Sequence, residues 1–122
     1  MIRPLTPQDY PEIERMIIES QHMYHPDFAK KEHTFVLDEE PKGFFTYTLL
    51  EGTPVLQQFY IDPKYRKISN ARELIKGFIE QMKGYKRFMI SGQEECKVIE
   101  YFFKKKPIRV SGVKKFYVIE VN

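Results

Sequence analysis

The sequence has a single cysteine, Cys96, among its 122 residues. One cysteine cannot form an internal disulfide, and it cannot supply the thiolates of a structural zinc site. We expect its thiol to be a small buried hydrophobe rather than a nucleophile. Long apolar runs are lacking too, since none reaches the roughly 20 residues that a membrane-spanning helix requires. No charged-then-apolar leader is visible, and we therefore expect a cytoplasmic protein with no membrane partner.

The sequence has little excess of charge of either sign. Lys and Arg number 20 against 17 Asp and Glu, for a formal net charge of +3. This mildly basic balance favours an anionic cofactor but is weak support for nucleic acid as a partner. The basic and aromatic residues do not follow the pattern of an RNA-binding sheet, so the aromatic side chains are expected in the core. No repeat or linker is visible, and residues 1–122 are expected to form one domain.

The most specific pattern lies in residues 55–84. An apolar, aromatic and β-branched run predicts a strand over 55–61, buried on both faces. Asp62-Pro63 ends this strand, because proline cannot donate to a sheet ladder. A loop over 64–69 then leads into an amphipathic helix, with Asn70 as the expected N-cap. The first amides of a helix are unpaired and its dipole favours negative charge, so this junction predicts an anion site with phosphate as the ligand.

This stretch resembles the acetyl-CoA-binding core of the GNAT (Gcn5-related) N-acetyltransferases. The family's "V-D-P-x-x-R"-like strand exit and its Arg/Gln-x-x-Gly-x-Gly/Ala loop correspond here to residues 59–63 and 66–71. The resemblance implies acetyl-CoA as co-substrate, with its pyrophosphate on the loop amides and its extended arm along the strand backbone. The cofactor-binding residues implied in this way are Phe59, Tyr60, Ile61, Arg66, Lys67, Ile68, Ser69, Asn70, Ala71 and Arg72.

The loop departs from the family pattern at two positions. Ser69 stands where the first motif glycine is expected, and Lys67 where another glycine often follows the arginine. Glycine lets a backbone approach phosphate closely and tolerates positive φ, which serine does less readily. The plain alternative is that Ser69 and Asn70 only cap a core helix.

The order of the remaining elements matches the same family. Turn residues and apolar periodicity predict further strands over 1–5, 33–37, 44–50, 86–90, 108–110 and 114–121, turns over 38–43 and 51–54, a helix opened by Thr6-Pro7, a broken segment over 21–31 and a helix over 93–105. The expected fold class is therefore α/β (α+β). It is a GNAT-like fold, with a central mixed, mostly antiparallel sheet of about seven strands flanked by about four helices. The resemblance further implies that strands four and five splay apart around the cofactor.

The broken segment contains His22, Tyr24 and His25. In the family this region is variable and helps to form the acceptor pocket, so these three residues are weak candidates for acceptor binding. Two histidines three residues apart can meet on a helix face, but further ligands would have to come from afar, and no metal site is predicted. Contact with the acceptor or transfer of a proton is the stronger hypothesis, although such pairs usually have no special role.

The catalytic residues cannot be assigned from the sequence. The family often places a glutamate base on its fourth strand, where this chain has Gln57 and Gln58 and no carboxylate before Asp62. We expect either that these glutamines line a polar pocket or that one of them occupies a β-bulge. The family's acid is usually a tyrosine that aligns with Phe103, and phenylalanine has no hydroxyl to donate.

Two hypotheses of different classes remain. The first is an acetyl-CoA-dependent N-acetyltransferase that acts on a primary amine of a small molecule or protein. The second is a catalytically inactive GNAT-like module for binding or assembly, of the sort that compact viral or mobile-element proteins use. The loop departures and Phe103 favour the module, whereas the retained Arg66, Ala71 and strand exit favour the enzyme, which we prefer. The resemblance also implies pairing of two chains through strand edges near the C-terminus.

Overall fold

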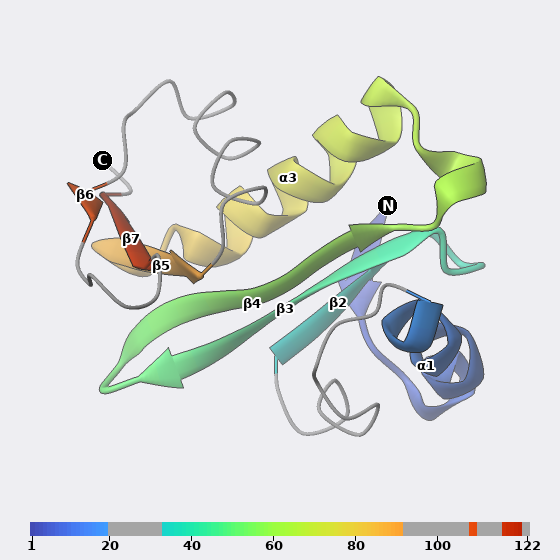
Figure 1. The fold of residues 1–122 in the computed structure, drawn as a ribbon, viewed down its shortest axis with the longest axis horizontal. Coiled ribbons are helices and arrows are strands. Elements are labelled where there is room, and N and C mark those ends of the chain that lie inside the picture. Colours follow the sequence, from blue (N-terminus) through green and yellow to red (C-terminus); the bar gives the residue numbers. More distant parts are fainter. Residues whose placement is uncertain (20–32, 92–107, 110–115, 121–122) are drawn as a thin grey trace.

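The computed structural model describes residues 1–19, 33–91, 108–109 and 116–120 (Figure 1). Its elements are β1 (Ile2–Pro4), α1 (Tyr10–Glu19), β2 (His33–Leu37), β3 (Gly43–Leu50), β4 (Thr53–Ile61), α3 (Ile68–Met82), β5 (Arg87–Ser91), β6 (Ile108–Arg109) and β7 (Phe116–Glu120), with short 3-10 turns at Pro7–Asp9 and Pro63–Tyr65. The predicted helix over 93–105 and the segment over 21–31 lie outside the described residues.

The strands form one seven-stranded sheet in the order β1-β2-β3-β4-β5-β7-β6. Every neighbouring pair is antiparallel except β4 and β5, which are parallel. The predicted mixed, mostly antiparallel sheet is therefore confirmed. This order places β4 at the centre of the sheet, with the only parallel pairing among the described strands beside it.

The two described helices cover opposite faces of the sheet (Figure 1). Successive side chains of a strand point to opposite faces, so neighbours in sequence enter different cores. Thus Phe44 packs with Ile13, Met16 and Ile17 of α1, whereas Phe45 meets Phe78 of α3 edge to face, with ring centroids 5.4 Å apart. Because both faces of β3 are covered, both Phe44 and Phe45 are fully buried although they point to opposite faces.

The start of α1 agrees with the predicted cap. Thr6 is the N-cap and Pro7 the first residue of the 3-10 turn that leads into the helix. The backbone amide of Thr6 donates to Asp9 Oδ2 at 2.9 Å, and Arg3 of β1 donates to both carboxylate oxygens of Asp9, at 2.7 and 2.8 Å. This two-pronged pair with Arg3 lowers the pKa of Asp9 to about 2.

The predicted turns on either side of β3 were too long. β3 begins at Gly43 rather than Phe44, and a Cβ on Gly43 would lie only 2.6 Å from the carbonyl oxygen of Tyr60. A glycine is therefore required where β3 meets β4. The second turn consists of Glu51 and Gly52 alone, because Thr53 already pairs with Leu50.

Candidate functional site

β4 and β5 separate halfway along β4. They pair only at Val55 with Met89 and at Leu56 with Ile90, although β4 continues to Ile61. At the far end of β4, the amide of Asp62 donates to the carbonyl of Lys42 on the β3 side, at 2.9 Å. Backbone groups alternate in direction along a strand. Phe59 and Ile61 therefore direct their amides and carbonyls toward the side from which β5 has diverged.

The separation begins at a β-bulge. Thr46 of β3 lies opposite Gln58, but Tyr47 lies opposite Leu56, so Gln57 is the extra residue on β4. Of the two predicted roles for the glutamines, the bulge is thus borne out for Gln57. A bulge bends and twists its strand, which explains why β4 leaves β5 at this point.

The loop between β4 and α3 is held by hydrogen bonds to Tyr65. The amide of Tyr65 donates to the carbonyl of Asp62, and its own carbonyl accepts from the amide of Lys67, each at 2.8 Å. The same carbonyl also accepts from Nδ2 of Asn70 at 2.7 Å. The prediction of Asn70 as N-cap was wrong. α3 begins three residues earlier than expected, at Ile68, with Lys67 in the cap position and no side-chain cap. The side chain of Asn70 bonds to the loop instead of capping the helix.

The earlier start of α3 changes which amides are available to an anion. The amide of Lys67 donates to Tyr65, and the amide of Ala71 donates to the carbonyl of Lys67 at 3.0 Å. The three amides between them, at Ile68, Ser69 and Asn70, precede the first helical hydrogen bond and are directed out of the helix end. Of the predicted loop residues, these three have their backbone donors left for a ligand.

Neither replacement of a motif glycine strains this loop. Lys67 has φ of −114° and ψ of 151°, an ordinary extended conformation. Among the described non-glycine residues only Asp38 and Glu51 have positive φ, so Ser69 is an unstrained helical residue. The conformational freedom of glycine is therefore not needed at either position.

Cations surround the start of α3. Lys64, Arg66 and Lys67 are all exposed, and Arg66 donates from Nε to the carbonyl of Ile61 at 2.9 Å. Lys64 and Lys42 hold their ammonium groups 5.2 and 5.6 Å from the centre of the Tyr65 ring. No pattern in the sequence pointed to Lys42, because it belongs to the turn between β2 and β3 and reaches this loop only through the fold.

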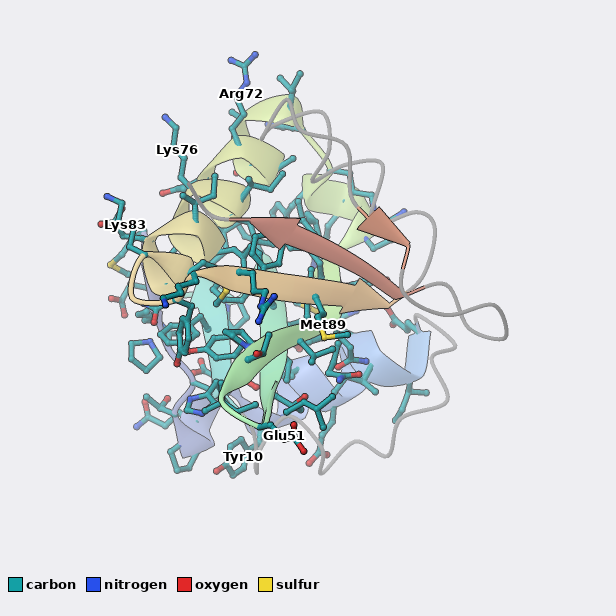
Figure 2. All side chains as sticks on the ribbon, turned by 90° about the vertical axis from the view of Figure 1, so that its left-hand side faces the viewer. Tyr10, Glu51, Arg72, Lys76, Lys83 and Met89 are labelled. Carbon is teal, nitrogen blue, oxygen red and sulfur yellow. The ribbon has the colours of Figure 1, made fainter. Side chains whose placement is uncertain are left out.

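Arg72, also predicted to bind the cofactor, lies on the outer side of α3. Figure 2 shows Arg72, Lys76 and Lys83 extending away from the sheet, and all three side chains are exposed. Phe59, Tyr60 and Ile61 instead belong to β4 itself, where the guanidinium of Arg66 lies 5.2 Å from the centre of the Tyr60 ring. The structure thus groups the strand end with residues 66–70, and Arg72 faces solvent.

Several predicted residues lie outside the part of the chain that the structure describes. They are His22, Tyr24, His25, Cys96 and Phe103, and their roles remain predictions. Within the described residues, no cluster of three or more His, Cys, Asp or Glu side chains is placed to hold a metal ion. No helix in the described ranges has the length and apolar character to cross a membrane.

By sequence, the chain matches no family model and no curated protein. By structure it is similar to NAA60 of Arabidopsis thaliana in complex with acetyl-CoA, with a TM-score of 0.77 and 14% identity over 98% of this chain and 97% of that one. It is also similar to the Escherichia coli GNAT family N-acetyltransferase YhbS in complex with CoA, with a TM-score of 0.71 and 16% identity over 100% and 81%. A third similar structure is a GNAT family acetyltransferase of Staphylococcus aureus, with a TM-score of 0.72 and 12% identity over 100% and 99%. The chain therefore has the fold of the GNAT acetyltransferases over nearly its whole length.

Proposed function

We propose that this protein is an acetyl-CoA-dependent N-acetyltransferase that transfers an acetyl group to a primary amine of an acceptor. The observation that carries the proposal is the position of the α3 N-terminus directly after the open edge of β4. A helix end binds phosphate through its unpaired amides, and an open strand edge binds an extended amide-bearing chain by adding a strand. Coenzyme A has both of these parts, a pyrophosphate and an arm with two amide bonds.

The residues present fit such a cofactor. The amides of Ile68, Ser69 and Asn70 are placed to donate to the pyrophosphate oxygens, and the loop before them carries the exposed side chains of Lys64 and Lys67. The backbone of Phe59 is directed to the β5 side of β4, as is the amide of Ile61, whereas the carbonyl of Ile61 already accepts from Arg66. When bound, the cofactor supplies an activated acetyl thioester.

The two glutamines of β4 contribute binding and orientation rather than proton transfer. A glutamine side chain has no titratable proton in the useful range, so neither Gln57 nor Gln58 serves as the base. Holding an amine close to a thioester carbonyl accounts for a large share of such a rate enhancement. The acetyl-CoA complex of NAA60 and the CoA complex of YhbS support the cofactor assignment by similarity of fold.

The test is calorimetric titration of the protein with CoA and with acetyl-CoA. We expect a Kd of roughly micromolar order. Ser69→Asp places a negative charge at the second residue of α3, where the helix dipole favours it. This variant should fold at least as well as the wild type, yet weaken CoA binding by about tenfold or more.

The matched control is Gln8→Glu, which makes the same change of charge in the exposed 3-10 turn before α1. It should leave the Kd for CoA unchanged. Absence of CoA binding by folded wild-type protein would overturn the proposal and favour the inactive GNAT-like module instead. Equal weakening by the two variants would place the anion somewhere other than the start of α3.

A further inference from the structure

The face of the sheet that α1 packs against changes from apolar to polar in its next row of side chains. Beside Val36 and Phe44, which pack with α1, lies a row formed by Thr34, Thr46 and Gln58, opposite one another across β2, β3 and β4. All three residues are at most 5% exposed. The sheet therefore buries a strip of uncharged polar groups beside its apolar core.

The bulge in β4 extends this strip. Gln57 donates from Nε2 to Thr48 Oγ1 at 3.0 Å, and Thr48 lies on the same face of β3 as Thr46, two residues away. Two successive glutamines of β4 are thus turned to one face. We call Thr34, Thr46, Thr48, Gln57 and Gln58 the polar strip. Gln57 and Thr48 are only partly buried, so the strip runs from the interior toward the surface.

Within the polar strip, the Gln58 side chain has no hydrogen-bond partner. The hydroxyls of Thr34 and Thr46 are paired with each other at 2.9 Å. Gln58 is 0% exposed, and neither its Nε2 nor its Oε1 has a hydrogen-bond partner among the described residues. Buried amides without partners are rare because they lower stability. Stability alone therefore favours an apolar side chain of the same shape here, and the carboxamide calls for another explanation.

We propose that Gln58 binds an amide group of a peptide acceptor. This inference rests on the proposed acetyltransferase function. Gln58 lies at the bulge where β4 leaves β5, one residue before the strand end assigned to the cofactor. A carboxamide presents two donors and an acceptor, so it can donate to a peptide carbonyl and accept from a peptide amide at once.

The charges on this face favour a peptide over a polycationic amine. Recognition of a polycation relies on carboxylates placed against it, and the polar strip contains none. The carboxylate of Asp62, which directly follows β4 and lies on the same side of the sheet, is already paired with Arg15 of α1 at 2.7 Å. Gln58 therefore acts as a specificity-determining residue that orients a neutral backbone and takes no part in proton transfer.

The first test uses Gln58→Met, which keeps the length of the side chain and removes its hydrogen-bonding groups. The melting temperature should rise, since a buried unpaired amide is removed. The kcat/KM for acetylation of a pool of synthetic peptides with free α-amines should fall about tenfold or more, while the Kd for CoA is unchanged. Acetylation of spermidine should be slower than that of peptides in the wild type and insensitive to the substitution.

Gln57→Met is the matched control for stability. Its amide has a partner in Thr48, so this variant should not melt at a higher temperature than the wild type. A fall in melting temperature for Gln58→Met would show that the Gln58 amide is structurally satisfied and would overturn the proposal. If Gln58→Met still binds CoA and its kcat/KM for peptides is unchanged, the proposal is overturned as well, although the proposed acetyltransferase function stands.

A second readout follows the amide directly. The ¹⁵N-labelled side-chain NH₂ of Gln58, assigned by its loss in Gln58→Met, should shift when the peptide pool is titrated into the protein, with and without CoA. Spermidine should not shift it. Peptide-induced shifts elsewhere but not at Gln58 would overturn the proposal. Loss of the proposed function would appear separately, as absence of CoA binding in calorimetry.

Discussion

Arg15 of α1 donates from Nη2 to Oδ2 of Asp62 at 2.7 Å, and so joins the first helix to the end of the central strand. The Asp62 side chain is only 7% exposed. Its backbone amide and carbonyl are bonded to Lys42 and Tyr65 respectively. The residue that opens the candidate cofactor loop is thus held by α1, by the turn before β3 and by the loop itself.

Breaking the pair from the arginine side should destabilise the protein. Arg15→Met leaves the Asp62 carboxylate buried without its charged partner, and we expect a loss of about 1–3 kcal/mol in the free energy of unfolding. Urea denaturation measures this. Glu19→Gln is the control, because Glu19 pairs with the same arginine at 2.7 Å but is 48% exposed. Glu19→Gln should lower the free energy of unfolding by less than about 0.5 kcal/mol. If Arg15→Met and Glu19→Gln lowered it equally, the buried pair with Asp62 would contribute no more than the exposed pair with Glu19.

The Arg3–Asp9 pair should make stability fall at low pH. Arg3 lowers the pKa of Asp9 to about 2, from an ordinary value of 3.8. A carboxylate whose pKa is lower in the folded state stabilises it fully above pH ~4 and loses this contribution as the pH falls toward 2. The difference corresponds to about 2 kcal/mol. The wild type should exceed Asp9→Asn by about this amount at neutral pH and approach it near pH 2, as followed by urea denaturation at each pH. A gap that does not change with pH would contradict this account.

Gly77 of α3 is required by the approach of β1. A Cβ at this position would lie 2.9 Å from Cγ2 of Ile2 and 3.0 Å from its Cβ. Alanine is about 1 kcal/mol better than glycine inside a helix, yet we expect Gly77→Ala to destabilise by about 1–3 kcal/mol through overpacking. In an Ile2→Ala background the same substitution should become neutral or stabilising. Thermal unfolding of the four proteins in this cycle measures the coupling, and additive effects would count against the contact.

A substitution at the tip of the β3–β4 hairpin should increase the stability of the protein. Figure 1 shows this hairpin projecting at one end of the sheet, and both of its turn residues have positive φ, +49° at Glu51 and +82° at Gly52. Such a type I′ turn favours Asn-Gly. Glu51→Asn should therefore stabilise the protein by about 0.5–1 kcal/mol, and Glu51→Val should destabilise it. If Asn and Val behave alike in urea denaturation, the turn is not the type described.

The limits of sequence-based prediction are clearest around α3. The end of β4 at Asp62-Pro63 was predicted correctly, because proline acts on its immediate neighbours. The start of α3 was misplaced by three residues, because the side chain of Asn70 bonds to the carbonyl of Tyr65 in the folded loop and does not cap the helix. Because the helix start was misplaced, Ser69 was also expected to need the conformational freedom of the motif glycine that it replaces. Once α3 starts at Ile68, serine occupies an ordinary helical position.

The sequence by itself determined the type and order of the elements and the position of the basic loop, since hydrophobic period, proline and glycine act over a few residues. Only the tertiary structure decided which polar groups meet. It brought Lys42 to Tyr65, Arg15 to Asp62 and Gln58 to Thr46. These meetings depend on strand order, on register and on one bulged residue, and a shift of register by one residue would turn every side chain of a strand to the other face. No local pattern in the chain encodes that choice.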